Sequence, residues 1–430
     1  MREMKDSGIE WIGEIPRDWN VCKVKDGFVR KNSKAQEENP IVLSLARNGV
    51  KIRDMSNAEG QFADSYYNYN PVDIDDLLLN PMDLISGDNC SISYVKGVIS
   101  PAYTNLRYKK GIFPKFYHYY FKYQYWCKAF FSYGKGVSYE NRWTLNNETI
   151  MNYRIMVPSF VEQKKIANFL DTKCSEIDSL VEDINSEIKT LEEYKKSVIT
   201  EAVTKGLNPD AEMKDSEIEW IGEIPEDWEV SRLKYLVKKK ITDGTHQTPE
   251  YDDETTGSPF LSSKDITSGK INWSDIKYIT QNLHKKLHNE TKTQKDDILL
   301  AKNGTTGVAA IVEDDRIFDI YVTLALIRSN TDIILPKYLL YLINSNIAKK
   351  QFDEHLVGVG VPNLHLNVIN NIALPYARDL EVQSKIISFL DKKVSEIDSA
   401  VELKKEQLET LAEYKKSLIY EYVTGKKEVV

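Results

Sequence analysis

One long helix with a repeating apolar seam is predicted for residues 159–206. We expect it to begin with a capping box, because Ser159 and Glu162 can each bond a backbone N–H group that the first turn leaves free. From Ile166 to Val198, apolar residues recur at steps of three and four. This spacing is typical of a coiled coil, in which the seam of one helix packs against the seam of another.

A second helix with the same pattern is predicted within residues 377–430. The motif Phe169-Leu170-Asp171 returns 220 positions later as Phe389-Leu390-Asp391, and residues 193–197 return as residues 413–417. A seam of about 40 residues corresponds to roughly 60 Å of helix, and a single apolar stripe needs a partner stripe. We therefore expect the two helices of this chain to pack on each other through their apolar seams.

A short segment rich in tryptophan and isoleucine is also repeated. Residues 4–19 return as residues 213–228, and each copy carries two tryptophans and one proline. We call these the tryptophan segments, and we expect each to bury its apolar side chains against a neighbouring element. Stacking of Trp11 or Trp220 on a nucleic-acid base is the alternative.

The chain thus consists of the same three parts twice. Between each tryptophan segment and the following long helix, strand-like runs closed by turns mix with short helical runs. We predict a mixed α/β (α+β) fold in which two similar globular domains are joined by two long antiparallel helices. The predicted segments are 1–158, 159–206, 207–376 and 377–430. Since the globular regions keep the order of their elements but differ in the polar residues between them, a scaffold that recognises two different targets is favoured.

Composition is that of an ordinary globular protein, because 41% of the 430 residues are hydrophobic and 28% are charged. The net charge of −8 is unevenly distributed: residues 20–158 carry 18 basic against 13 acidic side chains, whereas residues 206–228 carry 1 against 8. One face of either globular domain is therefore compatible with nucleic acid. The charged N-terminus is unlike a signal peptide, and no window is apolar enough to span a membrane, so we expect a cytoplasmic protein without membrane contact.

No catalytic constellation is recognised. The nearest approach to an adenine methyltransferase tetrapeptide, Asn80-Pro81-Met82-Asp83, lacks the second proline and the aromatic residue, and no Walker-type phosphate loop is present. Solvated turn carboxylates are expected, with a metal-dependent nuclease as the alternative, at Asp75-Asp76, Asp252-Asp253, Asp296-Asp297 and Asp314-Asp315. We expect neither paired cysteines with ligand spacing nor two histidines four residues apart on a helical face, and therefore no metal.

Three motifs make the chain resemble the specificity subunit of type I restriction-modification systems. They are Glu-Trp-Ile-Gly-Glu-Ile-Pro-x-Asp-Trp at 10–19 and 219–228, Pro-x3-Glu-Gln-x2-Ile-x2-Phe-Leu-Asp at 158–171 with a looser copy at 375–391, and Asp-Gly-Thr-His-x-Thr-Pro at 243–249. The resemblance spans essentially the whole chain. In that family, two target-recognition domains each read one half of a split DNA site, and two long helices join them and dock modification subunits.

The resemblance implies a non-catalytic subunit that reads an asymmetric bipartite DNA site. Its implied partners are double-stranded DNA, two modification (methyltransferase) subunits and restriction (translocase) subunits. No cofactor is expected on this chain, since S-adenosylmethionine, ATP and magnesium would bind to partner subunits. Antiparallel helices would relate the two recognition domains by an approximate two-fold axis, which suits the two-fold axes of B-DNA. A coiled-coil adaptor that joins two protein partners without DNA recognition is the alternative.

Loop side chains that can form two hydrogen bonds are the predicted base readers, and nearby lysines are the predicted phosphate contacts. The candidates in the first domain are Arg47, Asn48, Lys51, Lys135, Tyr139 and Arg142. The candidates in the second domain are Thr245, His246, Lys264, Lys302, Asn303, Asn363 and His365.

Overall fold

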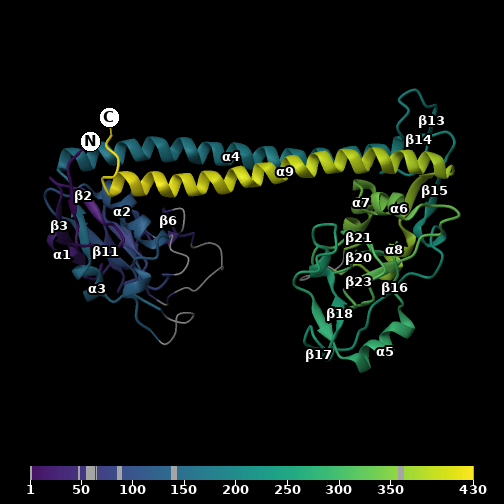
Figure 1. The fold of residues 1–430 in the computed structure, drawn as a ribbon, viewed down its shortest axis with the longest axis horizontal. Helices are drawn as coiled ribbons and strands as arrows, with labels where there is room; N and C mark the ends of the chain where they lie inside the picture. The colour runs from purple at the N-terminus through teal and green to yellow at the C-terminus, as the bar shows by residue number, and fades with distance from the viewer. Residues whose placement is uncertain are drawn as a thin grey trace. The chain divides into compact units, whose positions relative to one another are not determined.

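The structure, a computed structural model, divides into two compact units. Unit 1 comprises Met1–Ile184 and Lys405–Val430, and unit 2 comprises Asn185–Lys404. Each unit holds one globular part and one half of each long helix (Figure 1). The predicted division at residues 158, 206 and 376 remains a prediction. The residues that the structure describes are 2–46, 49–54, 63, 65–84, 90–136, 143–356 and 363–429, without the side chains of Asn289 and Glu290.

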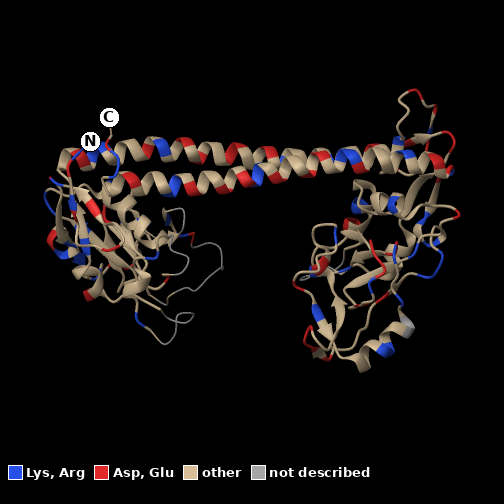
Figure 2. Cartoon of the chain, viewed as in Figure 1, with Lys and Arg blue, Asp and Glu red and all other residues tan. Residues whose placement is uncertain are grey.

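Both predicted long helices are present, as α4 (Phe160–Lys205) and α9 (Leu380–Val423). Leu170 and Leu390, from the repeated Phe-Leu-Asp motif, are fully buried in the cores of their units. Acidic and basic residues occur along both helices (Figure 2). A helix with one apolar stripe on an otherwise charged surface is stable only when that stripe is covered.

The two helices contact each other through a repeated ion pair. In unit 1, Lys415 Nζ of α9 lies 2.5 Å from Asp178 Oδ1 of α4. In unit 2, the residues related to these by the repeat form the same pair, with Lys195 Nζ 2.6 Å from Asp398 Oδ1. In each unit, the first half of one helix therefore meets the second half of the other. This reciprocal contact confirms the predicted antiparallel packing within each unit.

The start of α4 differs in one respect from the predicted capping box. Ser159 Oγ accepts the N–H of Glu162 at 3.2 Å, as expected. The carboxylate of Glu162, however, pairs with Arg2 and accepts the indole N–H of Trp19 at 2.9 Å. The second half of the predicted box is therefore wrong, because Glu162 connects the helix to the first tryptophan segment.

A buried glutamine in each long helix fixes the adjoining globular part. Gln163 accepts the backbone N–H of Phe113 at 2.8 Å and donates to two backbone carbonyls. Gln383 accepts the backbone N–H of Leu335 at the same distance and also donates to two carbonyls. Both glutamines are fully buried. The looser second copy of the motif therefore keeps this anchor.

The aspartate of the Phe-Leu-Asp motif provides a second anchor. Asp171 of α4 accepts the hydroxyl of Tyr119 at 2.7 Å and pairs with Lys115. Both partners lie on α2 (Pro114–Trp126). In unit 2, Asp391 of α9 forms the same two contacts with α6 (Pro336–Ile343), through a tyrosine hydroxyl at 2.6 Å and a lysine at 2.7 Å.

Each globular part contains an antiparallel four-stranded sheet of the same topology. In unit 1 the strand order is β4 (Phe28–Lys31), β11 (Thr104–Tyr108), β8 (Leu77–Leu79) and β9 (Cys90–Ile92). In unit 2 it is β16 (Thr242–Asp243), β23 (Leu324–Ile327), β20 (Ile298–Ala301) and β21 (Ala309–Ile311). A two-stranded sheet leads into each long helix: β3 (Asn20–Lys23) with β12 (Arg154–Val157), and β15 (Trp228–Arg232) with β24 (Ala373–Ala377). The predicted mixed fold with an internal repeat is confirmed.

The units differ in the elements inserted around these sheets. Unit 1 has two antiparallel strand pairs, β5 (Leu43–Ala46) with β6 (Gly49–Ile52) and β7 (Asn70–Val72) with β10 (Gly97–Ile99). Unit 2 instead has a second four-stranded sheet of β17 (Tyr251–Asp252), β19 (Lys277–Ile279), β18 (Ser258–Leu261) and β22 (Asp319–Ile320). It also has helix α5 (Gln281–Glu290). This helix corrects one prediction, because His284 and His288 stand four residues apart on it.

Each tryptophan segment forms a hairpin that is packed into its unit. The hairpins are β1 (Met4–Asp6) with β2 (Glu14–Pro16), and β13 (Met213–Asp215) with β14 (Glu223–Pro225). Trp19 and Trp228 are buried. Trp11 stacks on Tyr153, with ring centroids 5.9 Å apart, and donates to Gln124 at 3.0 Å. These contacts confirm the prediction that the first tryptophan segment packs its apolar side chains against neighbouring elements. They do not favour the alternative, in which Trp11 stacks on a base.

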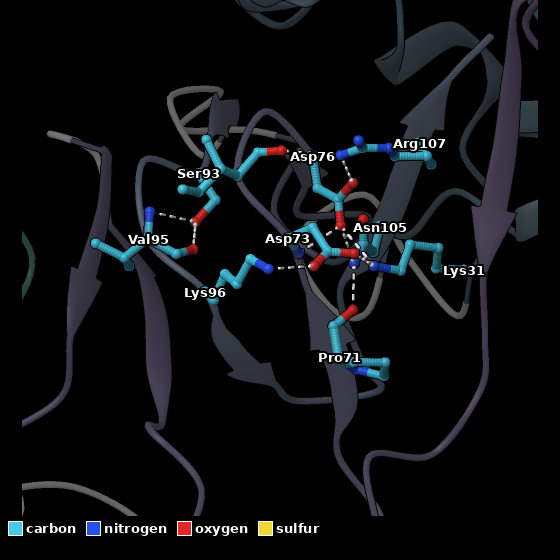
Figure 3. Close-up of polar contacts among 10 residues, drawn as sticks. Lys31, Pro71, Asp73, Asp76, Ser93, Val95, Lys96, Asn105 and Arg107 are labelled. Atoms are coloured by element: carbon cyan, nitrogen blue, oxygen red, sulfur yellow. Dashed lines mark hydrogen bonds and ion pairs between the residues drawn. The ribbon is translucent and has the colours of Figure 1, made fainter.

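Asp76 lies at the centre of a buried ionic cluster in unit 1 (Figure 3). Its carboxylate lies 2.9 Å from Lys31 Nζ and 3.1 Å from Arg107 Nη1. The amide of Asn105 donates to it at 3.3 Å, and the backbone N–H of Asp73 donates at 2.8 Å. The cluster therefore ties the turn before β8 to the edge strand β4 and to β11, which lies between β4 and β8.

The same arrangement recurs in unit 2, where Asp297 is fully buried and lies 2.7 Å from Arg328 Nε. The prediction of solvated turn carboxylates is therefore wrong for Asp76 and Asp297. Each is matched by a cation of the protein, which argues against a nuclease metal at these turns. The prediction is confirmed for the exposed pairs at 252–253 and 314–315.

Replacing Arg328 with methionine is expected to lower the free energy of unfolding by about 3–5 kcal/mol, because the carboxylate of Asp297 would stay buried without its partner. Lys349→Met is the matched control, since it removes only an exposed pair with Asp353 and should cost less than about 1 kcal/mol. Urea denaturation followed by circular dichroism measures both losses. Equal losses would contradict the structural role of the buried pair.

Candidate nucleic-acid interface

The loop that follows β16 in unit 2 is held by main-chain contacts. A Cβ atom on Gly244 would lie 1.9 Å from the carbonyl oxygen of Ile320, so only glycine fits this approach. The N–H of Thr245 donates to the same oxygen at 3.2 Å, and Thr245 O accepts the N–H of Val322 at 3.1 Å. With its backbone fixed in this way, the loop presents an exposed His246, of whose side chain 72% is accessible.

Below this loop, Lys302 forms a buried ion pair with Asp243. Lys302 is only 6% exposed, and its ammonium group donates to Asp243 Oδ2. The same carboxylate oxygen lies 3.3 Å from His246 Nε2. Burial is the largest single influence on Asp243 and disfavours its ionisation. The hydrogen bonds and charges of Lys302 and His246 together outweigh burial, so the pKa of this carboxyl lies below its usual value. The pair therefore orients His246 from beneath the loop.

Backbone contacts bring two more candidates beside Lys302. Its N–H donates to Thr323 O and its carbonyl accepts the N–H of Leu364, both at 2.8 Å. Asn303 and Asn363 form an isolated antiparallel bridge. Five candidates from three separate loops thus gather at one edge of the unit 2 sheet. The gathered residues are Thr245, His246, Lys302, Asn303 and Asn363.

The other two candidates of unit 2 make different contacts. Lys264 is half-exposed and donates to the carbonyl oxygen of Asp275 at 2.8 Å. It also lies 3.6 Å from the carboxylates of Asp265 and Asp275. His365 is exposed at the N-cap position of α8 (Leu366–Asn371). Acidic neighbours therefore offset the charge of Lys264.

In unit 1 the structure describes two of the six candidates. Lys51 is exposed on β6, and Lys135 is exposed beside its bridge to Thr144. The remaining candidates, Arg47, Asn48, Tyr139 and Arg142, lie outside the described residues.

A backbone contact shared by the two units allows their loops to be compared. The carbonyl of Pro81 accepts the N–H of Leu145 at 2.9 Å, just as Lys302 accepts that of Leu364 in unit 2. Proline in one unit and lysine in the other therefore occupy the same place in the fold. The two units keep the backbone of this site and differ in its chemistry.

A lysine run that our sequence analysis did not select lies just before β16 in unit 2. The loop that follows β16, residues 244–249, is called the recognition loop below, after the role that the sequence analysis predicts for it. Lys238, Lys239 and Lys240 are all exposed. Within the described part of the chain, their ammonium groups have no acidic partner. Adjacent exposed cations next to a loop of hydrogen-bonding side chains are the arrangement by which proteins contact phosphates beside the bases they read. The uninterrupted run of three lysines was the signal that could have identified them.

Comparison with known proteins identifies the class to which this arrangement belongs. A family model described as the type I restriction modification DNA specificity domain matches residues 16–190 and 225–412. The chain therefore belongs to this family, whose members are the non-catalytic DNA-recognition subunits of type I restriction-modification systems. The two matched stretches fall on the two copies of the repeat.

Two curated relatives match over nearly the whole chain. The type I restriction enzyme MjaVIII specificity subunit of Methanocaldococcus jannaschii is 27% identical over 425 residues, which are 96% of this chain and 93% of that protein. The type I restriction enzyme EcoBI specificity subunit of Escherichia coli is 23% identical over 421 residues, which are 93% of this chain and 84% of that protein.

One solved structure shows the same fold. It is a chain from a structure described as the basis of complex assembly and conformational transition of the type I R-M system, with a TM-score of 0.71 and 13% identity. The match covers 96% of this chain and 99% of the other. Among the described residues, no helix combines the length and the apolar character needed to cross a membrane.

The Lys302–Asp243 pair should appear as a coupling in a double-mutant cycle. Lys302→Met and Asp243→Asn are each expected to destabilise unit 2, while the double variant should lose less than the sum by about 0.5–3 kcal/mol, because both changes remove one interaction. Thermal and urea unfolding of the four proteins measure the coupling. The control pair is Lys264→Met with Asp275→Asn, whose side chains are 48% and 97% exposed and should show little coupling. If the double variant of Lys302 and Asp243 lost as much stability as the two single variants together, the buried ion pair would be contradicted.

Proposed function

We propose that this chain is the sequence-recognition subunit of a type I restriction-modification complex and that each unit reads one half of an asymmetric split DNA site. One observation supports the proposal above the others. The two units share a sheet topology, a buried aspartate–arginine pair and two anchors on the long helices. At the equivalent loop position, however, they carry Pro81 and Lys302. A shared scaffold with unlike loop chemistry suits recognition of two different half-sites.

The long helices support docking of two modification subunits. Tyr194 is 53% exposed in unit 2, and Tyr414, its equivalent in the repeat, is 54% exposed in unit 1. Tyr414 also lines a shallow hollow on α9, together with Glu406, Glu409, Thr410, Glu413 and Ser417. Exposed tyrosines are among the residues most enriched in protein interfaces. Because each unit carries one copy of this exposed tyrosine, two copies of one partner fit the chain.

The chemical steps belong, in this proposal, to partner subunits. The modification subunits would bind S-adenosylmethionine, and restriction subunits that join the complex would use ATP and magnesium. This chain contributes the choice of DNA sequence. The experiment that tests the proposal reconstitutes the chain with its modification subunits, incubates them with random-sequence duplex DNA and sequences the retained fraction. A split motif is expected, whereas retention without any motif would support the coiled-coil adaptor.

His246→Ala is expected to relax one base position in one half-site and to leave the other half-site unchanged. Loss of one base contact should weaken binding to the selected duplex by about 1–3 kcal/mol. The measurement is the retained motif and the affinity of the reconstituted complex. His355→Ala, an exposed histidine at the end of α7 (Asn346–Glu354), is the control and should change neither. An unchanged motif for the His246 variant would remove this residue from the base readers.

Replacing both Lys239 and Lys240 with alanine should weaken binding to all DNA sequences alike. Two lost phosphate contacts should reduce the slope of log affinity against log salt by roughly two, because each contact releases about 0.9 counterion. The salt dependence of binding, measured by fluorescence anisotropy, checks this value. Lys349→Ala with Lys350→Ala removes the same charge from exposed positions on α7 and should leave the slope unchanged. A similar slope for both double variants would place the phosphate contact elsewhere.

A further inference from the structure

Three side chains with metal-binding atoms converge in unit 2, and none of the three is a candidate base reader. His284 and His288 project from α5, and Asp319 begins strand β22. One ligand atom from each of the three lies within 4.8 Å of the others. Residues four apart on a helix share one face, so both imidazoles point to the same side. In the part of the chain that the structure describes, no other group of three such residues converges in this way.

The hydrogen bonds within this group leave two buried atoms without a partner. His284 Nδ1 lies 2.7 Å from Asp319 Oδ2, which accounts for one pair of atoms. Asp319 Oδ1 and His288 Nδ1 are both buried, and neither has a hydrogen-bond partner among the described residues. Asp319 itself is 1% exposed, and burial raises the pKa of its carboxyl despite the two nearby histidines. Leaving a buried polar group unpaired is unfavourable, so a ligand that satisfied both atoms would be stabilising.

A metal cation is the ligand whose chemistry fits these atoms. Two neutral imidazole nitrogens and one carboxylate oxygen form a donor set typical of Zn²⁺, whereas Ca²⁺ and Mg²⁺ prefer sites made entirely of oxygen. We propose that unit 2 binds one zinc ion through His284, His288 and Asp319. A fourth position in the coordination sphere is left for water, since the side chain of His284 is 17% exposed.

The position of Asp319 gives such an ion a structural consequence. β22 pairs in parallel with β18, and the carbonyl of Ile320, the residue after Asp319, accepts the N–H of Thr245. An ion bound at this site would therefore tie α5 to the strand that holds the recognition loop. Zinc binding itself does not depend on the proposed function, because the ligands are separate from the candidate base readers.

The test uses the full-length chain, freed of metal with a chelator and titrated with Zn²⁺ alone by isothermal calorimetry. Wild-type protein is expected to bind one equivalent, and its melting temperature should rise on binding. His284→Gln with His288→Gln removes two ligands and should weaken binding by more than the about 100-fold that loss of an outer-shell partner costs. This variant should also lose the rise in melting temperature.

The matched control is His355→Gln with His365→Gln, which removes two exposed histidines of unit 2 and should bind zinc like the wild type. Circular dichroism of the metal-free proteins checks that every variant is folded. If the double ligand variant does not fold, His288→Gln alone provides the same comparison, together with the visible spectrum of bound Co²⁺. Absence of zinc binding by the wild type, or equal binding by wild type and folded ligand variants, would overturn the proposal. The second result would place the ion elsewhere, for example on the free cysteines.

Discussion

Each long helix carries an apolar stripe on a charged surface, and the need to cover this stripe underlies the rest of the structure. Within each unit, the stripe is covered by the other helix and by the globular part. The globular part is fixed to the helix by a buried glutamine, Gln163 or Gln383, and by a carboxylate, Asp171 or Asp391. Because these polar anchors are buried, each must be fully hydrogen-bonded, and this requirement fixes the orientation of the sheet on the helix.

The same reasoning explains which residues the two units share and which differ. Asp76 and Asp297 are buried carboxylates whose cationic partners keep them stable in the interior, so neither unit can change them without a large loss of stability. The loop residues Pro81 and Lys302 share a backbone role, in which only the carbonyl is required. Their side chains are therefore free to differ. A protein with a shared interior and unlike loops can recognise two targets with one fold.

In unit 2, the loop that we propose to read DNA is held by groups that are themselves buried. Lys302 is buried beneath the loop and paired with Asp243, so its main contribution is to hold His246 and its neighbours in place. Asp319 is also buried, and it contributes indirectly: the next residue in its strand, Ile320, accepts the backbone N–H of Thr245. In the proposed function, residues of this kind set the geometry of the contact surface, while exposed residues such as Lys239 supply the contacts.

The sequence by itself determined the two long helices, the internal repeat, the tryptophan segments and the family. These features depend on local periodicity and on self-similarity, both of which can be read along the chain. Only the tertiary structure decided that Asp76 is buried, because its partners Lys31 and Arg107 come from strands that are far from it in the sequence. The His284-x3-His288 pattern is present in the sequence, but its meaning depends on a carboxylate that folding brings to it. Burial and the pairing of charges are decided by contacts between residues far apart in the chain, and a local pattern does not contain that information.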